Sequence, residues 1–330
     1  MKTSPFFKTR ITQMLGIDYP IICGGMNLIS RAELVAAVSN AGGLGILVSA
    51  MYQDKEQLRQ EIQKTRGLTD KPFGVNLNLF PRAPRPGVNI VTAGEFVEIL
   101  AQEGVKIVET SGRSPEPIMP ALKEAGIKVL HKTTAVRYAQ TAQRVGADAL
   151  IVVGYEAGGH PGMDDVASLV LIPQVVDALD IPVIVAGGVG DARGLVAALA
   201  LGAEGVLMGT RFMATKESPA HPRLKEAMLA ACEKDTVMIQ RSLRNPVRVW
   251  ANQQARKVLE MEERGAGLEE LLTITGGDKN ARVMLSGELE AGCVTFGQVV
   301  GQVRDIPLAG QVIEQMVREA LDIRDRLCRE

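Results

Sequence analysis

Residues 182–210 read PVIVAGGVGDARGLVAALALGAEGVLMGT, and the alternation within this stretch decides the fold. One apolar run, PVIVAGG (182–188), precedes a helical pattern, ARGLVAALALG (192–202), and a second apolar run, EGVLMGT (204–210), follows it. Continuous apolar strands that alternate with helices are typical of a parallel sheet that is buried on both faces. The stretch therefore predicts two consecutive βα units of such a sheet.

The same unit recurs through the first part of the chain at a spacing of roughly 25–35 residues, as a βα crossover requires. Six further apolar runs precede the two above: PIICGG (20–25), LGILVS (44–49), FGVNLN (73–78), VKIVET (105–110), KVLHK (128–132) and ADALIVVG (147–154). Eight such units predict an α/β fold of the closed (β/α)8 TIM barrel type. An open, doubly wound sheet is the competing architecture, and the number and regularity of the strands favour the barrel.

After Thr210 this alternation ends. Residues 213–292 contain helical patterns and no apolar run that indicates a strand. We therefore expect a barrel domain formed by residues 1–212 and 293–330, with a helical cap or insertion at 213–292 after the eighth strand. A long amphipathic helix within residues 305–330 would close the barrel. A cap at this place would cover the strand ends where barrel active sites lie.

The composition excludes several classes of protein. The chain has 330 residues, a formal net charge of −1 and no basic or acidic run, so neither nucleic acid nor an anionic membrane is an expected partner. The first residues lack the apolar core of a signal peptide, and no apolar stretch reaches ~18 residues, which predicts a cytoplasmic protein. The four cysteines are scattered and no histidine–carboxylate pair has metal spacing, so we expect no disulfide and no metal site.

Small residues follow the last two predicted strands. Gly187 and Gly188 end the seventh, and Gly209 and Thr210 end the eighth. In barrels, the loops after these two strands commonly bind phosphate through backbone N–H groups, and a threonine hydroxyl can add a donor. The alternative is that the glycines only form tight turns. Two such loops at the expected strands favour a phosphate site.

Three other strand ends carry residues that suit a flat, polar ligand. Lys132 follows an apolar strand, where an unpaired ammonium group is costly to bury. Asn76 places an amide within an apolar strand, and a buried amide needs hydrogen-bond partners. Gly25 and Met26 can offer a flat backbone surface and a soft thioether to a ring. The structural alternatives are a solvated lysine, an amide bonded to a backbone carbonyl, and simple core packing.

The segment EAGGHPG (156–162) contains His160, one of three histidines in the chain. Its glycines let a loop pass close to a ligand, and imidazole is the side chain best suited to exchange a proton near neutral pH. We therefore predict that His160 is catalytic, with a loop histidine bonded to the backbone as the alternative. His131 is expected to point to the outer side of its strand, and His221 marks the start of a helix. No G-x-S-x-G motif or Ser/His/Asp order indicates a hydrolase.

Several segments together resemble the nitronate monooxygenase (2-nitropropane dioxygenase) family, over nearly the whole chain. These segments are PIICGGM, KPFGVNLNL, HKTTAVRYA, EAGGHPG, PVIVAGGVGDARGLVAALALGAEGVLMGTRFMATKES and QRSLRNPVRV. The resemblance implies an FMN-dependent enzyme built on a barrel with a helical cap, with His160 as the active-site imidazole. It implies FMN phosphate contacts from Gly187, Gly188, Gly209 and Thr210. It implies flavin-ring contacts from Gly25, Met26, Asn76, Lys132, Ala157 and Gly158.

The branch of the family is less sharply indicated. The end of the first strand, CGGM, and the stretch HKTTAVR resemble NADH:quinone reductases of this fold, whereas GGM and EAGGH are shared with flavin-type enoyl-ACP reductases. The resemblance thus implies either oxidation of nitronates with O2, or hydride transfer from NADH or NADPH through FMN to a quinone or an enoyl thioester. No G-x-G-x-x-G fingerprint follows a strand, so a nicotinamide would bind only transiently. The cap residues that either contact it or form a solvated basic face are Arg241, Arg244, Asn245 and Arg248.

Two other classes of protein stay open. A barrel with two phosphate loops also fits a lyase or isomerase that uses no flavin, in which Lys132 forms a Schiff base or neutralises charge. A ligand-binding barrel without catalysis is the third possibility. In each case we expect a small-molecule ligand, and a monomer or a homodimer.

Overall fold

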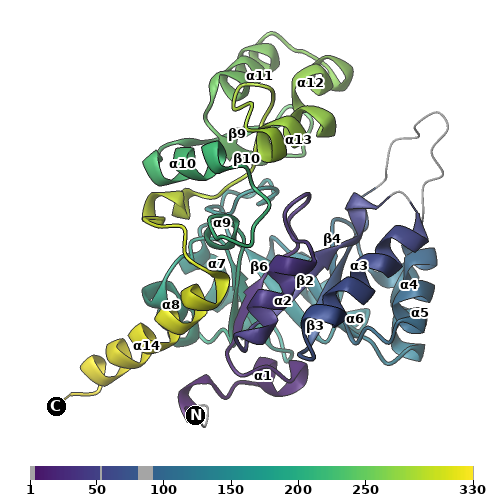
Figure 1. Ribbon diagram of the computed structural model, residues 1–330, viewed down its shortest axis with the longest axis vertical. Coiled ribbons are helices and arrows are strands. Elements are labelled where there is room, and N and C mark those ends of the chain that lie inside the picture. The colour runs from purple at the N-terminus through teal and green to yellow at the C-terminus, as the bar shows by residue number, and fades with distance from the viewer. Residues whose placement is uncertain (1–3, 53, 81–91, 330) are drawn as a thin grey trace.

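Eight parallel strands close into a barrel in sequence order, with the last strand paired to the first. The computed structural model describes residues 4–52, 54–80 and 92–329. This architecture confirms the (β/α)8 TIM barrel and excludes the open sheet (Figure 1). The strands are β1 (Ile21–Cys23), β2 (Leu44–Val48), β3 (Phe73–Asn78), β4 (Ile107–Ser111), β5 (Lys128–Thr133), β6 (Ala149–Val153), β7 (Val183–Ala186) and β8 (Gly205–Met208).

The strands are continuous apolar runs because both of their faces are covered. In β6, Ile151 lies in the cluster that fills the barrel interior, whereas Leu150 and Val152 pack with the helices outside. Burying one such aliphatic side chain contributes roughly 1.5–3 kcal/mol, so a register shift that exchanged the two faces would be strongly disfavoured. The same alternation decides which side chains at the strand ends reach the mouth of the barrel.

An outer layer of helices surrounds the barrel. After the short helix α1 (Arg10–Leu15), the helices between the strands are α2 (Ala32–Asn40), α3 (Lys55–Leu68), α4 (Ala93–Gln102), α5 (Met119–Glu124), α6 (Val136–Arg144), α7 (Ser168–Asp177) and α8 (Ala192–Ala200). The helix α14 (Ala309–Leu327) packs against both α8 and α2, and buries Val312, Ile313 and Met316 there. The predicted long helix is therefore present, and it fills the outer layer between α8 and α2, whereas the pairing of β8 with β1 closes the barrel itself. Within the described residues, no helix has the length and apolar character to cross a bilayer.

The chain between β8 and α14 forms a cap above the strand ends (Figure 1). Its elements are α9 (Thr210–Met213), α10 (Pro222–Ala230), β9 (Thr236–Ile239), β10 (Val247–Trp250), α11 (Gln253–Glu263), α12 (Leu268–Thr275) and α13 (Gly277–Ser286). The expectation that residues 213–292 hold no strand was wrong, because β9 and β10 pair in antiparallel fashion. Their Ile239, Val247 and Val249 form a small core with α11. The division of the chain into a barrel domain (1–212 and 293–330) and a cap (213–292) remains a prediction.

Candidate active site

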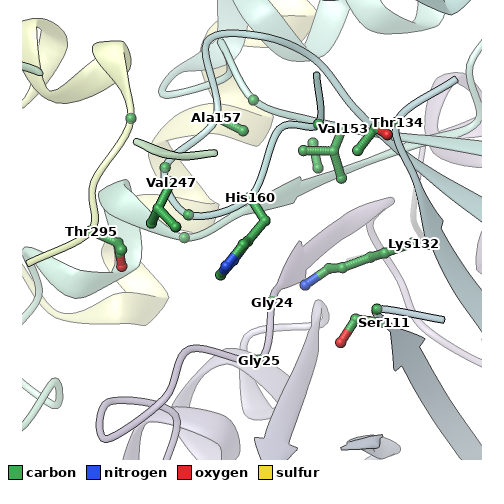
Figure 2. Close-up of a pocket in the computed structure, with 18 of the residues that line it drawn as sticks. Gly24, Gly25, Ser111, Lys132, Thr134, Val153, Ala157, His160, Val247 and Thr295 are labelled. Atoms are coloured by element: carbon green, nitrogen blue, oxygen red, sulfur yellow. The ribbon is translucent and has the colours of Figure 1, made fainter. Parts of the chain in front are cut away.

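A cavity of about 1030 Å3 lies at the C-terminal ends of the strands, between the barrel and the cap. Figure 2 shows that the side chains of His160 and Lys132 enter the same space, next to Gly24 and Gly25. The residues predicted for the site come from six different strand ends, and the fold brings all of them to this cavity. They are Gly25, Met26, Asn76, Lys132, Ala157, Gly158, His160, Gly187, Gly188, Gly209 and Thr210.

Three polar side chains form a network in the floor of the cavity. The Oε1 atom of Glu109 accepts a hydrogen bond from Nδ2 of Asn76 at 2.6 Å and lies 2.8 Å from Nζ of Lys132. Glu109 is fully buried, and its Oε2 atom has no hydrogen-bond partner within the described residues. Lys132 is therefore not the solvated lysine of the structural alternative, and Asn76 is bonded to a side chain rather than to a backbone carbonyl.

Sequence reasoning assigned no role to Glu109, although a signal for it existed. Ile107 lies in the cluster inside the barrel, and alternate residues of a strand share a face, so Glu109 must point inward as well. The register then places Asn76 beside Glu109 on the neighbouring strand. A carboxylate at an inward position of an apolar strand requires a partner, and Lys132 is the cation that provides it.

The loops after β7 and β8 provide hydrogen-bond donors at the cavity. Gly187 and Gly188 have φ values of 99° and 74°, which are left-handed conformations that favour glycine. Within the described residues, no acceptor is found for the backbone N–H of Gly188 or of Gly209. The Thr210 hydroxyl accepts a hydrogen bond from the N–H of Gly297 at 2.9 Å, which leaves its own proton for another acceptor. Donors that the protein does not use itself suit an anionic group.

Close packing explains the glycines in the walls of the cavity. A Cβ atom on Gly25 would lie 2.8 Å from Cβ of Asn76, and one on Gly158 would lie 2.6 Å from the backbone of Phe296. Near Gly209, a Cβ atom would lie 3.4 Å from Sδ of Met26. A side chain at either position would therefore displace neighbouring protein. Gly25 and Gly158 also line the cavity and are at least partly exposed, and a flat ring can approach backbone of this kind.

His160 extends from the glycine-rich loop after β6. Its ring is exposed to the cavity, lies 5.7 Å from the ring of Phe80 between centroids, and places Nε2 3.5 Å from Nδ2 of Asn245. The protein that surrounds the cavity lowers the pKa of His160 below its usual 6.5, because even partial removal of the imidazole from water disfavours its charged form. A neutral imidazole at pH 7 can accept a proton from a ligand in the cavity.

The other two histidines have structural partners. The ring of His131 is buried on the outer face of β5, with Nδ1 2.8 Å from Oγ1 of Thr110 on the neighbouring strand. This agrees with the expected outward orientation. His221 precedes α10 and accepts a hydrogen bond from the backbone N–H of Arg223 at 3.2 Å, as a helix-start residue does.

Burial of His131 predicts a loss of stability in acid. Desolvation lowers the pKa of His131 from 6.5 to about 4, so below pH 6.5 the unfolded chain takes up a proton that the folded chain does not. The contribution of His131 to the free energy of unfolding is fully present above the unfolded-state pKa of 6.5. It is lost as the pH decreases from 6.5 to 4, and the loss amounts to at most about 3 kcal/mol. Urea unfolding at several pH values measures this. The variant His131→Gln, which cannot take up the proton, should lose this part of the pH dependence, and an unchanged profile would contradict the assignment.

The four cap residues singled out in the sequence lie in different surroundings. Arg244 and Asn245 line the cavity, and Arg241 forms an exposed ion pair with Asp165. Arg248 is only 2% exposed, so the expectation of a solvated basic face is wrong for this residue. Its burial depends on partners in the loop after β6, which lies about ninety positions earlier in the chain and could not be inferred from the local pattern.

Known proteins match this chain over almost its full length. The family model described as nitronate monooxygenase matches residues 8–319. A relative from Mycobacterium tuberculosis, named "(3aS,4S,5R,7aS)-5-hydroxy-7a-methyl-1-oxo-octahydro-1H-indene-4-carboxyl-CoA dehydrogenase", is 35% identical, over 95% of this chain and 96% of the relative. A "Probable nitronate monooxygenase" from Staphylococcus aureus is 38% identical, over 70% of this chain and 75% of the relative.

Solved structures are also similar to this chain. The structure of FabK from Thermotoga maritima has a TM-score of 0.89 and 38% identity, over 97% of this chain and 98% of that one. The nitroalkane oxidase from Streptomyces ansochromogenes has a TM-score of 0.81 and 27% identity, over 96% and 99% of the two chains. These similarities include both the barrel and the region between β8 and α14.

Proposed function

The chain belongs to the nitronate monooxygenase family, and from this premise we propose that it is an FMN-dependent oxidoreductase that works in the cavity at the barrel mouth. One observation carries the proposal. A single cavity of about 1030 Å3 joins two donor-rich loops, a buried carboxylate–lysine pair and an exposed imidazole. This volume is at the upper end of small-molecule sites, which suits a cofactor together with a substrate.

The residues present fit an FMN molecule. The unused N–H groups of Gly188 and Gly209 and the hydroxyl proton of Thr210 suit its phosphate. The glycine backbone at positions 25 and 158, which lines the cavity, suits a flat ring system. The remaining predicted contacts are Met26, Asn76, Lys132, Ala157 and Gly187. When bound, FMN supplies a group that accepts and returns electrons or hydride.

In this proposal His160 handles the proton. With a neutral nitroalkane, its imidazole takes the proton from the carbon next to the nitro group, and with a nitronate it holds the anion. With a quinone or an enoyl thioester, reduced at the expense of NADH or NADPH, it donates a hydrogen bond or a proton to the acceptor. A lowered pKa keeps the ring neutral at pH 7, which favours the role of base.

Oxidation of a nitronate is the first candidate reaction, and reduction or oxidation of an acyl thioester is the second. Two observations favour the second candidate. A relative that matches 95% of this chain is named as a carboxyl-CoA dehydrogenase. The cavity is rimmed by the exposed side chains of Arg113 and Arg244, which have no ion-pair partner within the described residues and could attract a phosphorylated carrier. In contrast, the ion pair of Lys132 disfavours a Schiff-base reaction, because a paired ammonium group is a poor nucleophile.

The absorption spectrum of the purified protein tests the proposal. Flavin bands are expected, either as isolated or after addition of FMN. Bands that bleach with NADH or NADPH without oxygen would assign a reductase, and a panel of quinones and enoyl thioesters would follow. Bands that bleach only with a nitronate would assign a nitronate monooxygenase. A protein that shows no flavin bands after FMN is added would overturn the proposal.

Thr210→Val tests the phosphate site without any turnover. The variant loses one hydroxyl donor, and a lost hydrogen bond to a charged group costs roughly 1.5–3 kcal/mol, so FMN affinity should fall by about ten-fold or more. Titration of the apoprotein, followed by flavin fluorescence, measures this affinity. Thr236→Val is the control, since Thr236 lies in β9 and its hydroxyl bonds to Arg248 instead. Equal affinities of Thr210→Val and the wild type would place the phosphate elsewhere.

A further inference from the structure

Arg248 in β10 is a buried cation with an unusual set of partners. Its side chain is 2% exposed, yet within residues 4–52, 54–80 and 92–329 no carboxylate forms an ion pair with it. Removing a guanidinium from water is costly unless its donors are satisfied. The contacts that satisfy this group therefore indicate what the residue is for.

Most of these contacts go to one loop. We call residues 155–162 the histidine loop and residues 236–250 the cap hairpin. The Nε and Nη2 atoms of Arg248 donate to the carbonyl oxygen of Tyr155 at 3.1 and 2.9 Å, and the guanidinium lies 4.4 Å from the centre of the Tyr155 ring. Its Nη1 atom donates to Oγ1 of Thr236 within the hairpin at 3.0 Å. The side chain thus ties the start of the histidine loop to the cap.

The backbone of Arg248 binds the same loop at a second point. Its N–H donates to the carbonyl oxygen of Gly159 at 2.7 Å, and the N–H of Gly159 donates back to the carbonyl of Arg248 at 3.1 Å. This reciprocal pair is an isolated antiparallel bridge. The histidine loop is therefore held on the edge of the cap hairpin, and the residue that follows the bridge is His160.

The histidine loop has little stiffness of its own. Gly159 and Gly162 both have φ of 84°, and Gly158 precedes them, so glycines flank the pair His160–Pro161. Glycine loses more conformational freedom on folding than any other residue, and a loop of this composition does not fix its own shape. External contacts therefore help to define the position of the imidazole. Arg248 supplies contacts at residues 155 and 159, and the N–H of Gln298 donates to the carbonyl oxygen of Glu156 at 3.0 Å.

Two further hairpin residues meet the same part of the chain. Nδ2 of Asn245 lies 3.5 Å from Nε2 of His160. Arg241 pairs with Asp165, but both side chains are about 40% exposed, and exposed pairs contribute about 0–1 kcal/mol. Arg248, with its buried contacts, is therefore the main attachment between hairpin and loop.

We propose that Arg248 is a positioning residue for His160: it holds the histidine loop against the cap hairpin so that the imidazole extends into the cavity. The importance of this position for turnover rests on the proposed function, in which His160 exchanges a proton with the substrate. The position of the imidazole does not depend on that proposal, and it can be measured without any reaction. A displacement of about 1 Å at a reacting group can cost roughly a hundred-fold in rate.

Histidine NMR of the full chain tests the proposal directly. The chain contains three histidines, so labelling at Cε1 gives three signals, and loss of one signal in His160→Ala identifies that of His160. In Arg248→Lys, which keeps the charge but loses the fork and the stacking, the His160 signal should shift or broaden. The signals of His131 and His221 should stay in place and report that the rest of the chain is folded.

Thr236→Val is the matched control. It removes the bond of the same guanidinium within the hairpin and leaves its bonds to Tyr155 intact. The His160 signal should remain as in the wild type. If Arg248 only stabilised the cap, both variants would move the signal alike, and if the loop did not depend on Arg248 at all, neither would. Either outcome would overturn the proposal.

Two measurements separate failure of this proposal from failure of the proposed function. With an active substrate, Arg248→Lys should lower kcat by about ten-fold or more and change KM by less than about three-fold, because orientation rather than binding is impaired. Should that variant not fold, hydrogen exchange of the wild type decides: the Gly159 amide, bonded to the Arg248 carbonyl, should be protected. Free exchange there would overturn the proposal. A moved His160 signal with unchanged turnover would count against the catalytic histidine only.

Discussion

Replacing His160 with alanine is expected to lower turnover by roughly 10²–10⁴-fold, the usual contribution of a positioned acid or base. The imidazole lies in the cavity near Lys132 and Gly25 (Figure 2). FMN binding should persist, because the proposed phosphate and ring contacts lie on other residues. Stopped-flow reduction and steady-state rates, with flavin content measured in the same sample, test both parts.

His221→Asn is the matched control for this experiment. The replacement removes an imidazole of the same chain, and asparagine keeps an acceptor for the N–H of Arg223 at the start of α10. Its rates should equal those of the wild type. If His160→Ala also turned over at the wild-type rate, the imidazole would have no catalytic role, whatever the flavin content.

Replacing Lys132 with methionine is expected to destabilise the fold by about 3–5 kcal/mol, the cost of leaving one partner of a buried ion pair alone. Glu109 is fully buried, and its Oε1 atom lies 2.8 Å from Nζ of Lys132. Without the ammonium group, Asn76 is the side chain that still donates to this carboxylate at 2.6 Å. Urea unfolding of the protein measures the difference in the free energy of unfolding.

A double variant separates the charge from the packing. Lys132→Met combined with Glu109→Gln leaves no unpaired charge in the barrel, so most of the lost stability should return. Lys123→Met is the surface control, because Lys123 pairs with Asp148 and is 44% exposed, and such pairs contribute about 0–1 kcal/mol. Equal losses for Lys132→Met and Lys123→Met would show that the Lys132–Glu109 pair is not buried in solution.

The barrel could be predicted because its strands are apolar on both faces, and such strands appear in the sequence as continuous apolar runs. The alternation of Leu150, Ile151 and Val152 between outer and inner clusters is the local form of this rule. The positions at the strand ends followed directly, since parallel strands of a barrel end at one face. This is why Gly25, Asn76 and the other predicted residues all line one cavity.

The cap could be predicted only in part. Its strands TVMI and VRVW have four residues each, and so short an apolar run cannot be distinguished from a helix segment by periodicity. Arg248 looked like a surface residue because arginine is rarely buried. The bonds that bury it come from Tyr155 and Gly159, which only the tertiary fold brings near. The inward direction of Glu109 follows from the alternation along β4, but its ion pair with Lys132 depends on the pairing of β4 with β5 in the folded barrel.

Because the cap lies between β8 and α14 in the chain, it delays the synthesis of the helix that packs between α8 and α2. The ribosome makes β8 about a hundred residues before it makes α14, which at 5–20 residues per second is a delay of roughly 5–20 s. During this interval the apolar surfaces of α2 and α8 that α14 covers remain open to solvent and to other chains. A nascent chain of this topology should therefore depend on chaperones most strongly while its cap is being translated.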